Sequence, residues 1–208
     1  MSNKNLSESA QNDTDLLIQL REKFVVQAQE QGLLEVAYRT VESPVGTLLL
    51  AGTDRGLVRL AFESENFDAV LQFLAQKVSP RILSVNSALD EVARQIEQYF
   101  SGQRQRFNVP LDLRLSTDFR RSVQLELDTI GYGQTMSYAH MAQQVGKPKA
   151  VRAVGSACAT NPLPIVLPCH RVLRTDGSLG GYLGGLEVKE ALLRLENPDY
   201  GQQKPTLF

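Results

Sequence analysis

The sequence predicts an α+β protein in which an N-terminal antiparallel β-meander with helices is followed by a mainly helical domain that contains a helix-turn-helix. Three observations predict this class. Short strand-like runs separated by Gly/Pro breaks fill residues 34–62. Apolar residues at helical spacing recur in most segments after that point. Residues 138–145 and 149–158 form two short helix-like segments around a break at Gly146-Lys-Pro148.

Composition is that of an ordinary globular protein, with 42% hydrophobic and 22% charged residues in 208. No apolar run reaches the ~18 residues of a membrane span, and the polar first 15 residues hold no apolar signal core. We therefore expect a cytoplasmic protein that does not contact membranes. Two cysteines and two histidines cannot supply a disulfide framework and make a structural zinc site improbable, so no metal and no cofactor are expected.

Charge is distributed unevenly along the chain. Residues 129–175 contain five Lys and Arg and no acidic residue, which leaves −6 for the rest of a chain whose net charge is −1. Both histidines and both cysteines lie in the same stretch. A basic region on an acidic body suits contact with a polyanion. A solvated surface with acidic neighbours from elsewhere in the fold would look the same, and charge alone does not choose between them.

Residues 1–33 are interpreted as a polar tail and a helix. Residues 1–12 are expected to be disordered. Residues 14–31 have one apolar stripe made of Leu17, Leu20, Phe24 and Ala28, and Gly32 follows. This helix is expected to pack on the body as an appendage.

Residues 34–103 are predicted to form a supporting α/β domain. Strands are expected at 34–42, 47–51 and 57–62, and helices at 67–78 and 86–100. This region has no constellation of catalytic residue types, so we expect it to act as structural support. Residues 104–115 are expected to be an extended connection.

Residues 116–208 form the second predicted domain, with helices at 116–127, 138–145, 149–158 and 187–196. Apart from Arg152, the third of these helices carries small side chains, which would let its backbone approach a nucleic-acid groove closely. The same pattern would also suit tight packing on a neighbouring element. An ordinary helical hairpin is the alternative to a helix-turn-helix, and the basic charge favours DNA.

The chemistry-bearing residues are Cys169-His170-Arg171, which follow an apolar run and Pro168. A thiolate is a strong nucleophile, but a cysteine thiol needs a base or a cationic environment to ionise at neutral pH. Neighbours in an extended chain point to opposite sides, so we expect either a turn here or a bridging water that carries the proton. A buried structural thiol and a core histidine are the alternatives. Cys158 has no adjacent base and is interpreted as packing or pocket wall.

Four glycines surround Tyr182 in residues 178–186, a loop whose backbone can approach a ligand. A plain surface linker is the alternative, and the absence of a following GK[ST] disfavours a nucleoside-triphosphate site. Glu196 could orient a histidine, but spacing alone favours a solvated charge at a helix end.

Several ordered blocks resemble the O(6)-alkylguanine-DNA alkyltransferase family. The match covers roughly residues 119–196. In chain order the blocks are Thr135-Met-Ser-Tyr138, Gly146-Lys-Pro-Lys-Ala-Val-Arg-Ala-Val-Gly155, Asn161-Pro162, Pro168-Cys-His-Arg-Val172, Gly181-Tyr-Leu-Gly-Gly185 and Lys189-Glu-Ala-Leu-Leu193. Several blocks around a reactive cysteine are far more specific than one short pattern.

The resemblance implies direct-reversal DNA repair. Cys169 would accept the alkyl group irreversibly in a single turnover, from O(6)-alkylguanine and from O(4)-alkylthymine, after the base has been flipped out of the duplex. His170 would act through a water as the base, Glu196 would orient His170, and Asn161 would brace the turn between the helix pair and the active site. The resemblance also assigns substrate contacts to five residues: Tyr138, Val172, Tyr182, Leu183 and Gly184.

The implied partner is double-stranded DNA, entered through the minor groove by a protein that is monomeric in solution. The sequence leaves open whether several copies are cooperative on DNA. Arg152 would replace the flipped base in the stack. The other implied DNA contacts are Lys147, Lys149, Ala150, Ala153, Gly155 and Arg171.

Two departures from the family pattern concern Gln124, where the family often has tryptophan, and Leu183, where it has a small polar residue. Two other functions remain open at this point. A non-catalytic alkyl-lesion binder or helix-turn-helix regulator would need no reactive thiol. A cysteine hydrolase would turn over repeatedly and need an oxyanion hole.

Overall fold

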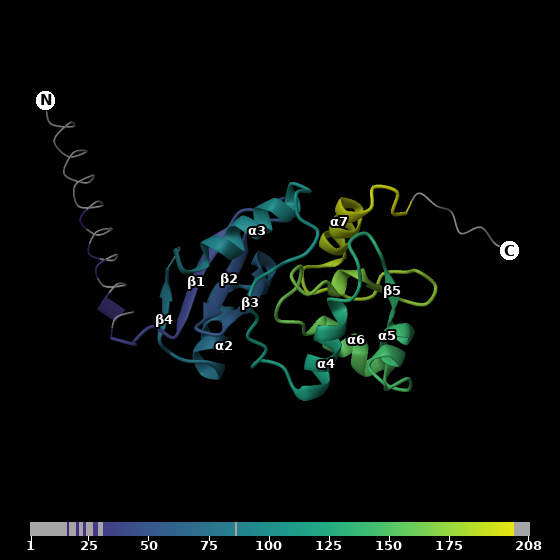
Figure 1. Ribbon diagram of the computed structural model, residues 1–208, viewed down its shortest axis with the longest axis horizontal. Coiled ribbons are helices and arrows are strands. Elements are labelled where there is room, and N and C mark those ends of the chain that lie inside the picture. The colour runs from purple at the N-terminus through teal and green to yellow at the C-terminus, as the bar shows by residue number, and fades with distance from the viewer. Residues whose placement is uncertain are drawn as a thin grey trace, which may run out of the picture.

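The structure is a computed structural model that describes residues 31–85 and 87–201, together with Leu16, Leu20, Lys23, Gln27 and Ala28. A half built on a sheet and a mainly helical half lie side by side (Figure 1). The predicted fold class is confirmed.

The N-terminal half is built on a four-stranded sheet in the order β3-β2-β1-β4. Strands β1 (Val36–Val41), β2 (Leu48–Thr53) and β3 (Gly56–Phe62) pair antiparallel, as expected. Strand β4 (Ile82–Ser84) was not predicted and pairs parallel to β1, so the sheet is not a pure meander. Three residues at a sheet edge carry too little alternation to be recognised in a sequence.

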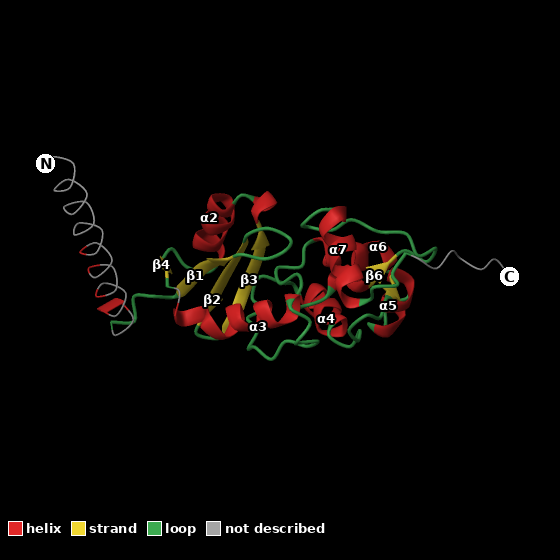
Figure 2. Ribbon diagram, turned by 90° about the horizontal axis from the view of Figure 1, so that it is seen from above, coloured by secondary structure: helices red, strands yellow, loops and turns green. Residues whose placement is uncertain are grey.

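Two helices cover opposite faces of this sheet, α2 (Phe67–Lys77) and α3 (Asp90–Phe100) (Figure 2). Alternation along β2 separates the two faces. Leu49 and Ala51 pack in the cluster that holds α2, whereas Leu48 and Leu50 join the larger core that contains α3 and continues into the helical half. The α3 face of the sheet is therefore the face joined to the second half.

The helical half contains α4 (Asp118–Leu127), α5 (Tyr138–Gln144), α6 (Val151–Ala159) and α7 (Leu186–Glu196). The predicted helix pair is thus formed by α5 and α6. Two short strands that were not predicted, β5 (Met136–Ser137) and β6 (Val172–Leu173), pair parallel. They join the start of α5 to the segment that follows Cys169.

The predicted helix at 14–31 and the expected disorder at 1–12 lie mostly outside the described residues. The five described residues before residue 31 are helical. Ala28 is buried, but Leu20 on the predicted apolar stripe is 53% exposed, so the packing expected for the stripe is absent at Leu20. None of the helices in the described part of the chain is long and apolar enough to cross a membrane.

Gln124 in α4 is fully buried, and neither atom of its side-chain amide has a hydrogen-bond partner among the described residues. A buried polar group left unpaired costs about 1–3 kcal/mol. We expect Gln124→Met, which has a similar volume and no amide, to raise the free energy of unfolding by about that amount. Denaturant titration would measure it.

The exposed Gln72 of α2 offers the matched control, because Gln72→Met removes an amide that water already satisfies. That variant should keep wild-type stability. A loss of stability in Gln124→Met would mean that the buried amide is satisfied in solution.

Candidate functional site

The site is built on the segment from Asn161 to Leu173, in which every residue is buried. This segment joins α6 to β6 through the core. Within it, Cys169–Arg171 forms a single 3-10 turn. The turn is one of the two arrangements expected from the sequence, and it removes the alternation that would separate neighbouring side chains in a strand.

Asn161 holds this segment in a strained conformation. Its Nδ2 donates to the Leu167 carbonyl at 2.8 Å, and its Oδ1 accepts from the Leu163 amide at 3.1 Å. Between them, Ile165 has φ +70°, a left-handed conformation that is unfavourable for a β-branched residue. Such strain costs about 1–3 kcal/mol and persists only where the surroundings enforce it. The two Asn161 bonds provide that enforcement.

Cys169 lies at the end of this braced loop and is only 2% exposed. Burial raises the pKa of its thiol to about 11, although a hydrogen bond from Asn161 Nδ2 to Sγ at 3.2 Å and the nearby Lys189 ammonium oppose the rise. The sulfur in this state is therefore a thiol at neutral pH. No base contacts Sγ directly among the described residues, and the Asn161 amide is the side chain that donates to it.

His170 is completely buried, and its Nε2 lies 2.9 Å from Oε1 of Glu196. Burial lowers the pKa of the imidazole, so the ring is neutral. An ionised carboxylate can only accept hydrogen bonds, so Nε2 carries the proton and Nδ1 carries the free lone pair. Nδ1 has no hydrogen-bond partner within the described chain.

Glu196 accepts from five donors. Oε1 receives Tyr99 Oη at 2.7 Å, His170 Nε2 at 2.9 Å and Arg171 Nη2 at 2.9 Å. Oε2 receives Arg171 Nε at 2.8 Å and the Gly133 amide at 3.2 Å. Burial alone would raise the pKa of this carboxyl, but hydrogen bonds from His170 and Arg171 hold it well below its usual range. Glu196 is thus a buried charge that orients a histidine, not the solvated helix-end charge that spacing favoured.

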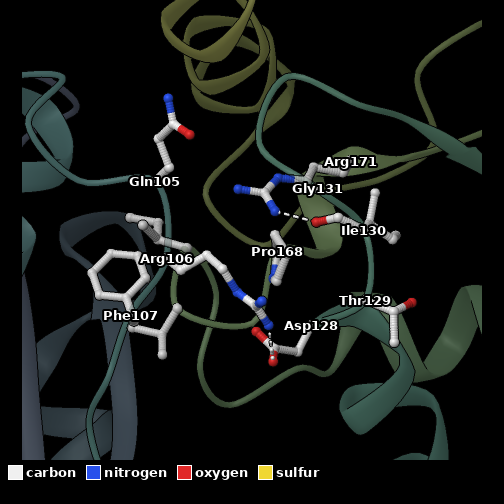
Figure 3. A pocket seen from close by; sticks show the side chains of 11 residues that line it. Gln105, Arg106, Phe107, Asp128, Thr129, Ile130, Gly131, Pro168 and Arg171 are labelled. Carbon is white, nitrogen blue, oxygen red and sulfur yellow. Dashed lines mark hydrogen bonds and ion pairs between the residues drawn. The ribbon is translucent and has the colours of Figure 1, made fainter.

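Arg171 belongs to the same buried network. Only 5% of it is exposed, and its guanidinium pairs with Glu196 and donates to the Ile130 carbonyl (Figure 3). In this structure Arg171 therefore faces the interior and is not exposed like the other cations predicted to contact DNA. Its local sequence is basic, but its partner lies 25 residues away on α7.

A cavity of about 110 Å³ adjoins Arg171 and Pro168. The ion pair of Arg106 with Asp128, at 3.0 Å, forms another part of its wall (Figure 3). Cys169 does not line this cavity, so it gives no route to the sulfur.

Tyr99 is the residue that sequence reasoning missed. It lies on α3, in the half assigned only a supporting role, and its hydroxyl reaches the carboxylate that holds His170. No local motif marks it, because the two residues are 97 positions apart.

Two tyrosines predicted to contact the substrate lie near the sulfur. Tyr138 begins α5, and its ring and hydroxyl pack so closely on Gly180 that a Cβ there would clash with them. The Tyr182 ring lies edge-on to His170, with centroids 6.4 Å apart, and its buried hydroxyl has no partner among the described residues. The glycine-rich loop therefore packs over the site and is not a plain surface linker.

The other predicted substrate residues are placed less uniformly. The Val172 carbonyl accepts from the buried Lys189 Nζ at 2.7 Å. Gly184 packs on Phe62 of β3, where a Cβ would come within 2.9 Å of the ring. Leu183 lines a separate cavity of about 440 Å³ together with Asn161.

The predicted DNA-binding residues of the helix pair form a basic surface. Lys147, Lys149, Arg152 and Ala153 are exposed, and Ala150 is half-buried. The half-buried Gly155 has open space where a Cβ would stand. No acidic side chain pairs with these three cations within the described ranges.

No cluster of three or more His, Cys, Asp or Glu that could hold a metal ion occurs in the part of the chain that the structure describes. The arrangement is thus a buried thiol beside a neutral, oriented histidine, under a glycine-rich loop and near a basic helix pair. It can move one proton and present one sulfur nucleophile.

Comparison with known proteins finds relatives of both halves of the chain. A family model described as 6-O-methylguanine DNA methyltransferase, ribonuclease-like domain, matches residues 36–113, and one described as the DNA binding domain matches residues 118–198. A methylated-DNA–protein-cysteine methyltransferase of Methanosarcina barkeri is 43% identical over 164 residues, which cover 76% of this chain and 96% of that protein. The constitutive enzyme of that name from Bacillus subtilis is 38% identical and is covered to 98%.

Solved structures are similar as well. The crystal structure of Mycobacterium tuberculosis O6-methylguanine methyltransferase aligns with a TM-score of 0.69 and 40% identity, covering 78% of this chain and 93% of that one. A crystal structure of Mycobacterium tuberculosis OGT in complex with DNA aligns with a TM-score of 0.67 at the same identity and coverage. With both halves of the chain matched, the protein belongs to the 6-O-methylguanine DNA methyltransferase family.

Proposed function

We propose that this protein repairs alkylated DNA by direct reversal. It rotates an O(6)-alkylguanine out of the duplex and transfers the alkyl group to Sγ of Cys169, and O(4)-alkylthymine is its second substrate. The observation that carries the proposal is the buried arrangement of Cys169, a neutral His170 and the Glu196 carboxylate that fixes the tautomer of His170. A nucleophile that reacts only once needs one proton acceptor and no cofactor.

The chemistry is a displacement at carbon. The lone pair on His170 Nδ1 accepts the Cys169 proton through one water, the sulfur–carbon bond forms, and the bond from carbon to the guanine oxygen breaks. The electron pair of that bond stays on guanine, which regains a proton. Overall, the thiol exchanges its proton for the alkyl group.

Tyr138 stabilises the charge that develops on guanine. Burial raises the pKa of its hydroxyl to about 12, so it remains a neutral donor at physiological pH. A hydrogen bond donated to a guanine ring nitrogen strengthens as negative charge builds there, which lowers the barrier to alkyl transfer. The Val172 carbonyl, Tyr182 and the Leu183–Gly184 part of the loop bound the space for the base.

Burial of the thiol fits this mechanism. A pKa of about 11 keeps the Cys169 thiol protonated and unreactive until an alkylated nucleobase enters the site and His170 takes the thiol proton. Indiscriminate alkylation of a single-use sulfur is thereby limited. The thioether product cannot return to the thiol by any group in the site, so each chain reacts once.

The helix pair supplies the DNA contacts. Small residues at positions 150, 153 and 155 let α6 enter the minor groove of duplex DNA, while Lys147 and Lys149 bind phosphates. Arg152 occupies the stack in place of the flipped base. The protein acts as a monomer in solution, and cooperative binding along DNA remains a prediction.

Intact-protein mass spectrometry after mixing with a duplex that contains O(6)-methylguanine tests the function. We expect one added methyl group per chain, located by peptide mapping on Cys169. A lesion-binding protein would retain the duplex without a gain in mass. A hydrolase would process many substrate molecules per chain, and either result would reject the proposal.

Arg152→Ala should slow methyl transfer from duplex DNA by roughly 10- to 100-fold, because the extruded base would leave an unfilled gap in the stack and unstacking costs a few kcal/mol. Reaction with free O(6)-benzylguanine, which needs no flipping, should keep its wild-type rate. Single-turnover kinetics on both substrates measure the ratio.

Lys149→Ala is the matched control, since it removes a neighbouring exposed cation that is assigned to phosphate alone. It should weaken duplex binding and reduce its salt dependence with little effect on the transfer step. Equal losses by Arg152→Ala on duplex and free base would refute the stacking role.

A further inference from the structure

Tyr99 connects the N-terminal half to the reactive site. It lies in the last turn of α3, its side chain is completely buried, and its hydroxyl donates to Glu196 Oε1 at 2.7 Å. Glu196 ends α7 in the other half of the molecule. Within residues 31–85 and 87–115, no other side chain donates a hydrogen bond to this carboxylate.

Aromatic neighbours fix the direction of this hydroxyl. The Tyr99 ring packs against Phe100, Phe107 and Tyr132, with centroids 5.2, 5.4 and 6.2 Å away. A ring held on three sides cannot turn its hydroxyl elsewhere without disturbing the core. The bond to Glu196 is therefore a built feature of the fold.

We propose that Tyr99 is a positioning residue for alkyl transfer: by sharing the charge of Glu196 Oε1, it keeps His170 neutral and able to accept the thiol proton. This inference rests on the proposed function of the site. It gives the N-terminal half a part in the chemistry in addition to support.

Three donors compete for one oxygen of Glu196. Oε1 receives Tyr99, His170 and Arg171, whereas a carboxylate oxygen has two lone-pair directions. Each donor withdraws negative charge from the others. With Tyr99 in place, the Glu196 carboxylate presents less negative charge to His170. Without it, the same carboxylate would stabilise a charged imidazolium, and an imidazolium cannot accept a proton.

The other groups around His170 stay constant when Tyr99 changes. Glu196 and Lys189 face it from α7, Cys169 and Arg171 flank it in its own turn, and Tyr182 covers it from the glycine-rich loop. Burial is the main cause that lowers the pKa of His170, and it does not change when Tyr99 loses its hydroxyl. A change in the pKa of His170 on mutation of Tyr99 therefore reports on the hydrogen bond between Tyr99 and Glu196.

Tyr99→Phe keeps the ring and removes only the hydroxyl. We expect the acid limb of the pH–rate profile for Cys169 methylation to move to higher pH, so that on this limb the rate constant falls roughly tenfold at a given pH. At alkaline pH, where His170 is neutral in both proteins, the rates should converge. Nitrogen-15 NMR of a chain with only two histidines should show the pKa of His170 raised.

Tyr132→Phe is the matched control, because Tyr132 lies in the same aromatic group and its hydroxyl donates to the Leu195 carbonyl at 3.2 Å, not to the carboxylate. It should leave the acid limb and the His170 spectrum at their wild-type positions. A merely structural role for Tyr99 would lower stability and shift neither readout.

Replacing Tyr99 with 3-fluorotyrosine gives a second measurement in a protein with an intact ring and hydroxyl. The hydroxyl of 3-fluorotyrosine is a stronger hydrogen-bond donor, so it should lower the pKa of His170, whereas Tyr99→Phe should raise it. Identical His170 spectra in wild type, Tyr99→Phe and the fluorinated protein would overturn the inference. The NMR measurement needs no DNA, so it decides the Tyr99–His170 link even if Cys169 proves not to be methylated and the proposed function fails.

Discussion

Cys169→Ser will fold and bind alkylated duplex DNA but gain no mass from it. A serine hydroxyl is far less acidic than a thiol and a much weaker nucleophile toward carbon. Deletion of a nucleophile typically lowers a rate constant on the order of 10⁶-fold, which is complete loss in a single-turnover assay. Serine can still accept the hydrogen bond that Asn161 gives to Sγ, so the braced loop is retained.

Cys158→Ala is the matched control, because Cys158 is a second buried thiol in the same half of the protein. Burial raises the pKa of Cys158 strongly, and no hydrogen bond from Asn161 opposes the rise. We expect this variant to accept one methyl group at the wild-type rate. Methylation of the Cys169→Ser protein, or its loss in Cys158→Ala, would assign the acceptor role to Cys158.

The parts of the fold that were predictable are those with local causes. Gly and Pro breaks delimit three strands, and apolar periodicity delimits the helices to within a few residues. Strand β4 and the β5–β6 pair escaped prediction because two or three residues form a strand only when tertiary structure brings them a partner. Their existence depends on contacts that no sequence window contains.

The site divides in the same way. Cys169 and His170 are adjacent and follow a proline, so their chemistry could be inferred from the chain. Glu196 looked like a solvated charge and Arg171 like a DNA contact, yet the two neutralise each other in the interior. Sequence shows a charge, but burial depends on what folds over it.

Tyr99 is the extreme case. It is one of six tyrosines, it lies in a helix with no catalytic pattern, and its partner is in the other half of the molecule. The environment of the Cys169 thiol could not be inferred from the sequence for a related reason. A basic neighbourhood lowers a thiol pKa only where the cations face the sulfur, and here burial has the larger effect.

Glu196→Gln is expected to have the second-largest effect, on both stability and rate. Glutamine presents an N–H group to donors that need an acceptor, so the buried Arg171 loses its charge partner. Breaking a buried ion pair by removing one partner costs about 3–5 kcal/mol. Denaturant titration should show a loss of this size.

Glu190 on α7 gives the control, because its side chain is 44% exposed and pairs with the more exposed Arg194. Ion pairs at the surface contribute only about 0–1 kcal/mol. Glu190→Gln should retain both stability and rate. If Glu196→Gln unfolds at ordinary temperature, the rate is measured in the cold and divided by the folded fraction. The effect on rate can then be separated from the effect on folding.

The rate effect follows from the tautomer. The carboxylate forces the proton of His170 onto Nε2 and leaves Nδ1 free, whereas an amide oxygen and nitrogen permit either tautomer. A histidine base left in the wrong tautomer loses on the order of 10⁴-fold in rate. We therefore expect Glu196→Gln to lose methyl transfer at every pH, whereas Tyr99→Phe should have a lower rate constant only on the acid limb of the pH–rate profile. Retention of the wild-type rate in folded Glu196→Gln would mean that His170 needs no carboxylate and that the base is another group.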